Sequence, residues 1–232
     1  MPALPVILVL GLVIIPSCTS GRAWAQGRTE VVTDLEGDGR RERLVLAAAG
    51  PHSLTIRREG KIVWRGIPRK WNPWKVQAAD VDGDGIKEIV LGVHKGTRFF
   101  PQPHNCLFVF GWDGKQAFPK WLGSRLSKPF VDFTLAQLDG EPGDELVSLE
   151  VTRGGRRCLV VYSWCGFGFA GDWQSPGFAR ARLSRDRRGR VILAVPGGGK
   201  RVLMRQGKSY RLEKTPIRES RCLPEPTRSR RG

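Results

Sequence analysis

The sequence predicts an all-β protein in which about four four-stranded antiparallel units follow one another, and three observations support this fold class. An acidic loop followed by an apolar run occurs as DLEGDGRRERLVL from Asp34, DVDGDGIKEIVLG from Asp80 and QLDGEPGDELVSL from Gln137. A second block, CLFVFGWDG from Cys106, returns as CLVVYSWCG from Cys158, with Cys-Leu, Val, Trp and Gly in register. The apolar runs are short, punctuated by Gly or Asp-Gly, and show no long amphipathic helix pattern.

Each unit is expected to contain four short strands. In the second unit we expect strands near residues 76–79, 88–93, 106–112 and 116–122, with a hairpin turn at Trp112-Asp113-Gly114-Lys115. Four short antiparallel strands per repeat make one blade of a β-propeller, whose faces are covered by the neighbouring blades. The sequence therefore predicts a β-propeller-like array at 26–214, with units at approximately 29–70, 71–123, 124–175 and 176–214. A four-bladed ring, an open array and half of a dimer all agree with this pattern.

The two ends of the chain differ from the repeats. Residues 4–16 form an apolar run of the length of a signal-peptide core, and Ala23-Trp24-Ala25 is a small-x-small cleavage pattern. We therefore expect a signal peptide at 1–25 and an exported protein, extracellular or associated with the cell envelope, although no Lys or Arg precedes the apolar run. The alternative is a lipoprotein anchored at Cys18. Residues 215–232 are rich in Arg and Pro and are expected to form a basic tail.

The net charge indicates which partners the protein could bind, and the cysteine count indicates which disulfides it could form. The formal net charge is +17, which for an exported protein favours an anionic cell-wall polymer or polysaccharide, or another envelope protein; a homodimer is a further option. Nucleic acid is not expected, because no stacking or groove-reading motif accompanies the charge. Membrane contact is expected only through the lipid anchor. The cysteines Cys106, Cys158, Cys165 and Cys222 could form two disulfides in any of three pairings, or remain buried thiols.

The acidic loops, with the strands that follow them, resemble the FG-GAP and VCBS repeats of integrin-α-type propellers and of many exported bacterial proteins. DVDGDGIKE is a specific match, DLEGDGRRE a good one and QLDGEPGDE a degenerate one. The fourth segment, RDRRGRVILAV near Arg185, has lost its acids. The resemblance covers nearly all of the mature chain and implies that Ca²⁺ is a structural ion of the loops. Propellers of this family commonly close with more than four blades.

The loop from Asp80 has the residue pattern of a calcium site, because carboxylates at alternate positions of a tight Gly-containing loop can converge on one ion. We expect its ligands to be Asp80, Asp82, Asp84, the carbonyl of Ile86, and Glu88. The same count gives Asp34, Glu36, Asp38, Arg40 and Glu42 in the first loop, and Gln137, Asp139, Glu141, Gly143 and Glu145 in the third. An EF-hand is not expected, because its twelfth position falls on Leu91 within a strand. The alternative is that the loops are solvated turns.

No GxSxG, HExxH, P-loop or SxxK motif occurs, so an enzyme is not expected. The first hypothesis is an exported calcium-binding module for adhesion or assembly at the cell envelope. The alternative is a carbohydrate-binding or carbohydrate-degrading secreted protein that uses Trp71-Asn72-Pro73-Trp74 and the loop at 94–105. Most of the other tryptophans are expected to pack between blades: Trp64, Trp112, Trp121, Trp164 and Trp173.

Overall fold

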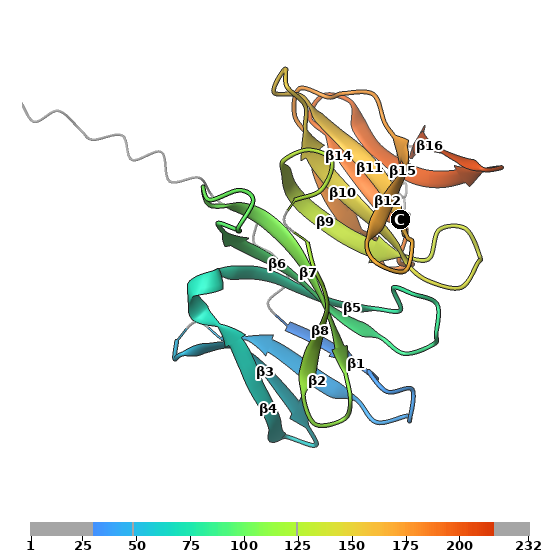
Figure 1. Ribbon diagram of the computed structural model, residues 1–232. Helices are drawn as coiled ribbons and strands as arrows, with labels where there is room; N and C mark the ends of the chain where they lie inside the picture. Colours follow the sequence, from blue (N-terminus) through green and yellow to red (C-terminus); the bar gives the residue numbers. More distant parts are fainter. Residues whose placement is uncertain (1–29, 48, 124, 216–232) are drawn as a thin grey trace, which may run out of the picture.

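The computed structural model describes residues 30–47, 49–123 and 125–215, which form four four-stranded antiparallel sheets (Figure 1). In every sheet the strands lie in chain order, so each strand pairs with the next one along the chain. This confirms the predicted all-β class of four blade-like sheets. The predicted signal peptide, the Cys18 anchor site and Cys222 lie outside the described residues, as does all but the first residue of the basic tail.

The sheets follow one another along the chain. The first contains β1 (Glu30–Thr33), β2 (Glu42–Leu46), β3 (His52–Arg58) and β4 (Lys61–Pro68); the second β5 (Pro73–Ala79), β6 (Glu88–Lys95), β7 (His104–Trp112) and β8 (Ala117–Leu122); the third β9 (Phe130–Ala136), β10 (Glu145–Val151), β11 (Arg157–Trp164) and β12 (Phe169–Gln174); and the fourth β13 (Arg182–Arg185), β14 (Val191–Val195), β15 (Gly199–Gln206) and β16 (Ser209–Lys214). A short 3-10 helix, η1 (Arg69–Trp71), links the first two sheets.

The four strands expected in the second unit are all present. Three of them are longer than the sequence pattern predicts: β5 begins at Pro73, and β6 and β7 continue to pair as far as Lys95 with His104. The expected loop at 94–105 is therefore shortened to residues 96–103. The predicted hairpin turn is built on Asp113, whose Oδ1 accepts hydrogen bonds from the amides of Lys115 and Gln116.

Three apolar cores fill the spaces between consecutive sheets. The middle strands of the second and third sheets are buried on both faces and read as continuous apolar runs, as EIVLGV does in β6. Neighbouring residues there face different cores: Leu91 faces the first sheet, and Val90 faces the third. In the first sheet, by contrast, exposed Arg43 alternates with buried Leu44. This terminal sheet therefore has one face exposed to solvent, as expected for the first unit of a repeat array.

The array of sheets is open. Contacts run from β1 and β2 to β5, from β5 to β9 and from β9 to β13. In the part of the chain that the structure describes, no apolar core joins the fourth sheet to the first. Of the arrangements that agreed with the sequence, the closed four-bladed ring is therefore not formed by this chain.

Aromatic rings occupy the gaps between sheets. Trp64 meets Trp112 edge to face across the first gap, with ring centroids 6.3 Å apart, and Trp173 meets Tyr210 across the third gap at 6.2 Å. Between the second and third sheets, Trp74 lies 5.6 Å from Phe133. Gly92 lies beneath this pair, and a Cβ there would come within 2.7 Å of Trp74. Glycine is required at this point of β6 because the two rings approach the backbone closely.

Trp71 is part of the first core as well. Its ring packs edge to face on Phe108 at 5.3 Å. The two tryptophans of the segment proposed for sugar binding, Trp71 and Trp74, therefore contribute to packing between sheets.

The described cysteines, Cys106, Cys158 and Cys165, are free thiols, so no disulfide joins any two of them. No helix among the described residues combines the length and the hydropathy that crossing a membrane requires.

Candidate metal centre

The three acidic loops lie along one side of the array, each between the first and second strands of its sheet; in Figure 1 they extend towards the right of the view. Adjacent loops are joined by backbone hydrogen bonds. The amide of Lys87 donates to the carbonyl of Leu35 at 3.1 Å, and the amide of Asp144 donates to the carbonyl of Asp80 at 2.5 Å. Each loop therefore helps to set the position of the next sheet.

The Asp80 loop curls around the carboxylate of its first residue. Asp80 Oδ1 accepts a hydrogen bond from the amide of Gly83 at 2.7 Å, and Oδ2 accepts one from the amide of Gly85 at 3.0 Å. Both glycines have positive φ, 78° and 85°. A residue with a side chain would be strained in this conformation. The DGDG sequence is thus required by the fold of the loop, with or without an ion.

Three carboxylates of this loop converge. Glu88 is the first residue of β6, is 2% exposed, and accepts a hydrogen bond from the amide of Val81 at 2.8 Å. Asp80, Asp82 and Glu88 each offer an oxygen atom, and these atoms lie within 4.8 Å of one another. Asp84, a predicted ligand, instead accepts a hydrogen bond from the amide of Ile86 at 2.8 Å and is not part of the group. Across the described ranges, this is the single acidic group that meets the geometry of a metal site.

Lys120 of β8 lies against two members of this group. Its Nζ is 2.5 Å from Asp82 Oδ2 and 2.9 Å from Glu88 Oε1. Burial raises the pKa of Glu88, and the hydrogen bond from Lys120 partly offsets this effect. Burial also acts to lower the pKa of Lys120, but its hydrogen bonds to Asp82 and Glu88 outweigh burial and raise it overall. The ammonium group therefore stays charged and offsets part of the negative charge of the carboxylates.

The first loop repeats the same hydrogen bonds. Asp34 accepts from the amides of Gly37 and Gly39 at 2.7 and 2.8 Å, and Glu42 accepts from the amide of Leu35 at 3.0 Å. The amide of Gly39 is the main cause of the lowered pKa of Asp34. Asp38 accepts from the amide of Arg40 at 2.8 Å, as Asp84 does from Ile86.

A guanidinium group takes the position in the first loop that Lys120 takes in the second. Arg58 Nε lies 2.7 Å from Glu42 Oε1, and its Nη2 pairs with Glu36. Glu36 and Glu42, which the sequence assigned to an ion, are therefore already paired with a cation of the protein.

In the third loop, the side-chain amide of Gln137 makes the hydrogen bonds that hold the loop together. Gln137 Oε1 accepts from the amide of Gly140 at 2.6 Å, while its Nε2 donates to the carbonyls of Glu141 and Gly143. The Gly143 carbonyl, expected to bind calcium, is thus occupied by a side chain. Asp139 pairs with Arg205 of β15 in the next sheet, at 2.8 Å.

Glu145 begins β10 as Glu88 begins β6. It is 6% exposed and accepts a hydrogen bond from the amide of Leu138 at 2.7 Å. Burial raises the pKa of Glu145 to about 7, and repulsion from Asp139 adds to the increase.

Replacing this residue should make stability less dependent on pH. Between pH values of about 4.5 and 7 the folded state holds a proton on Glu145 that the unfolded state has lost, so wild-type stability falls as the pH rises through this window. Glu145→Gln imitates the protonated form. Its free energy of unfolding should equal that of the wild type near pH 4.5 and exceed it by about 3 kcal/mol at pH 8. Denaturant titrations in chelator across this range test the expectation, and a difference independent of pH would contradict it.

Sequence reasoning missed the basic partners of the acidic loops. Arg58, Lys120 and Arg205 lie on β3, β8 and β15, far along the chain from the carboxylates that they meet. No spacing rule connects them to the loops. Two carboxylates close together, at the third and ninth loop positions, indicate that a cation lies near them. The sequence pattern did not show which residue supplies that cation.

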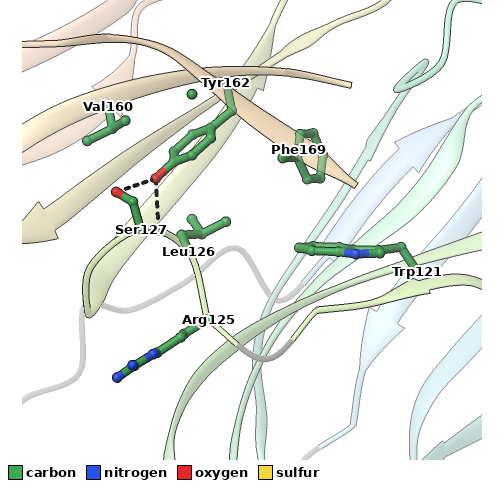
Figure 2. Close-up of a pocket in the computed structure, with 8 residues that line it drawn as sticks. Trp121, Arg125, Leu126, Ser127, Val160, Tyr162 and Phe169 are labelled. Atoms are coloured by element: carbon green, nitrogen blue, oxygen red, sulfur yellow. Dashed lines mark hydrogen bonds between the residues drawn. The ribbon is translucent and has the colours of Figure 1, made fainter. Parts of the chain in front are cut away.

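A separate pocket of about 320 Å³ lies between the second and third sheets (Figure 2). Trp121 and Phe169 form aromatic walls, with ring centroids 5.4 Å apart. The Tyr162 hydroxyl lies 2.8 Å from Ser127 Oγ and 2.5 Å from Glu150 Oε1. The buried carboxylate of Glu150 also accepts hydrogen bonds from the hydroxyls of Ser127 and Ser148. The other lining residues are Arg125, Leu126, Val160 and Gly171. The sequence pattern gave no indication of this pocket.

Comparison with known proteins gives distant structural likenesses. No family model and no curated protein matches the chain. A solved structure from Bacteroides uniformis, described as a "putative 6-phosphogluconolactonase", is similar with a TM-score of 0.44 and 14% sequence identity. The similarity covers 81% of this chain and 50% of that one, so the chain spans half of its length.

One expectation is corrected by this likeness. The similar structure carries the name of an enzyme, which contradicts the expectation from the sequence that the chain is not an enzyme. That expectation rested on missing motifs alone and is withdrawn. At this level of similarity the structure from Bacteroides uniformis carries no argument for a particular activity of this chain.

Proposed function

We propose that the chain is an exported β-propeller-like module of the FG-GAP/VCBS type that binds Ca²⁺ at the Asp80 loop and serves adhesion or assembly at the cell envelope. The observation that carries the proposal is the convergence of Asp80, Asp82 and Glu88 at the head of β6. The repeated loop geometry supports it, because the same hydrogen bonds shape the first and second loops.

The residues present fit a calcium ion. Ca²⁺ binds oxygen at 2.3–2.6 Å, so two oxygens on opposite sides of one ion lie at most about 5 Å apart. The oxygens of Asp80, Asp82 and Glu88 satisfy this limit, since all lie within 4.8 Å of one another. When bound, the ion would supply positive charge between the loop and β6. The first and third loops offer less, because among the described residues only the acidic oxygens of the Asp80 loop converge in this way. In the third loop the side-chain amide of Gln137 also binds the Gly143 carbonyl.

Calcium is therefore expected to stabilise the wild-type protein. Isothermal calorimetry on chelator-treated protein should show uptake of Ca²⁺, and the melting temperature should rise with its concentration, since a ligand that binds only the folded state stabilises it. Asp82→Asn should weaken binding at least tenfold, because it removes one of three converging charges. Glu213→Gln, which removes a half-exposed acid paired with Arg211 on β16, is the matched control and should bind like the wild type.

Two results would contradict the proposal. The first is a wild-type protein that takes up no Ca²⁺ and gains no thermal stability from it. The second is equal binding by Asp82→Asn and Glu213→Gln, which would place the ion away from the Asp80 loop.

An anionic polymer of the cell envelope is the proposed partner. The chain carries 39 Lys and Arg against 22 Asp and Glu. Many of the acids are engaged in the loops or in ion pairs, as Asp82, Glu36 and Asp139 are. The surface offered to a partner is therefore strongly basic, and attraction through it should weaken as salt is added.

Carbohydrate binding is the second candidate function, and the pocket beside Trp121 favours it. Aromatic walls next to hydroxyl groups suit the apolar face and the hydroxyls of a sugar ring. Pull-down on envelope polysaccharides at low and high salt separates the two candidates. Binding through charge fades at high salt, whereas stacking on Trp121 and Phe169 persists.

A further inference from the structure

A polar group of the protein itself lies between the oxygen atoms of each acidic loop. In the first two loops this group is a cation placed between the carboxylates of the third and ninth loop positions. Arg58 lies between Glu36 and Glu42, as Lys120 lies between Asp82 and Glu88.

The two cations reach equivalent positions by different routes. Arg58 is the last residue of β3, the third strand of its sheet, whereas Lys120 lies on β8, the fourth strand. The repeat therefore does not supply the cation from one fixed sequence position. A cation thus reaches the same pair of carboxylates from two different strands. This indicates that the loop requires positive charge there to keep the buried Glu at the ninth position in place. Glu42 is fully buried and Glu88 is 2% exposed.

The two cations differ in how firmly they are held. The guanidinium of Arg58 uses two separate nitrogens, one for each carboxylate, and its side chain is 19% exposed. Lys120 shares a single ammonium nitrogen between both acids, and its side chain is 25% exposed. An ammonium on a flexible stem can move into water, whereas a guanidinium that bridges two carboxylates is fixed in a planar fork.

We infer that Lys120 is the internal counter-cation of the Asp80 loop and that calcium binds by displacing it, whereas Arg58 permanently fills the first loop. The inference rests on the proposed function, because it states what sets the calcium affinity of that site. Lys120 holds the loop together in the absence of calcium and competes with the ion for Asp82 and Glu88. The wild-type protein therefore binds a single calcium, with an affinity lowered by Lys120.

The test compares Lys120→Met with Lys115→Met, using calorimetry with Ca²⁺ and melting curves in chelator and in calcium. Lys115 lies on the exposed turn between β7 and β8, so its replacement removes the same charge without touching the loop. Lys120→Met should bind Ca²⁺ roughly five- to tenfold more tightly than the wild type, the factor expected for release of one partly exposed ion pair. In chelator it should melt several degrees lower, and calcium should remove the difference. Lys120→Arg should stay close to the wild type in chelator.

The outcomes separate the inference from the proposed function. If Lys120→Met and Lys115→Met melt alike in chelator and bind calcium alike, the inference is overturned, while calcium uptake by the wild type would leave the proposed function standing. If none of the proteins takes up Ca²⁺, displacement is overturned together with the proposed function. A lower melting temperature of Lys120→Met would then show only that the lysine stabilises the loop.

Discussion

Phe133→Ala is expected to lower the free energy of unfolding by about 3–5 kcal/mol, the cost of removing a large buried aromatic side chain from a core. Phe133 is fully buried on β9, in the core between the second and third sheets. Its ring contacts Trp74 of the second sheet and Phe130 of its own strand, at centroid distances of 5.6 and 6.4 Å. The cavity would therefore open in the interface that joins two blades.

Urea or guanidinium titration of the purified variant measures this loss. Phe99→Ala is the matched control, because Phe99 lies in the loop after β6 and is 80% exposed. Its replacement should change stability by less than about 0.5 kcal/mol. Equal, small losses in both variants would contradict the description of a single packed core between these sheets.

Lys75→Met is expected to cost about 3 kcal/mol, because it leaves a partner charge buried without compensation. Lys75 Nζ lies 2.6 Å from Asp132 Oδ1 and also donates to the carbonyl of Phe133. The side chains of Lys75 and Asp132 are only 11% and 14% exposed. This ion pair connects β5 to β9, so its loss weakens the contact between the same two sheets.

Two further variants separate the ion pair from a general effect of charge. Arg43→Met breaks the pair with Glu30, whose side chains are 54% and 46% exposed, and should cost less than about 1 kcal/mol. The double variant Lys75→Met, Asp132→Asn should recover part of the loss, since neither partner is then charged. A double variant less stable than Lys75→Met would show that Asp132 stabilises the fold through other contacts.

Much of the fold follows from local patterns in the sequence. The apolar runs after each acidic loop predicted β6 and β10, since strands covered on both faces need continuous apolar residues. The DGDG sequence predicted the tight loop before β6, because Gly83 and Gly85 take positive φ there. Local patterns could not predict that the array stays open, because ring closure depends on whether the first and fourth sheets meet in space.

The candidate site was predictable only in part. Spacing indicated that Asp80, Asp82 and Glu88 would share one loop, and the structure brings their oxygens together. The same spacing also included Asp84, which instead accepts a backbone amide. Local spacing could not show Lys120, because the strand pairing between β7 and β8 determines which residue faces the loop.

A crystal structure of the protein grown with saturating Ca²⁺ tests the central claim most directly. The account predicts an ion bound by the carboxylates of Asp80, Asp82 and Glu88, with oxygen distances of about 2.3–2.6 Å. It also predicts that the Lys120 ammonium has moved away from Asp82 and Glu88. Lys120 still paired with both acids, and no ion at the loop, would contradict the account.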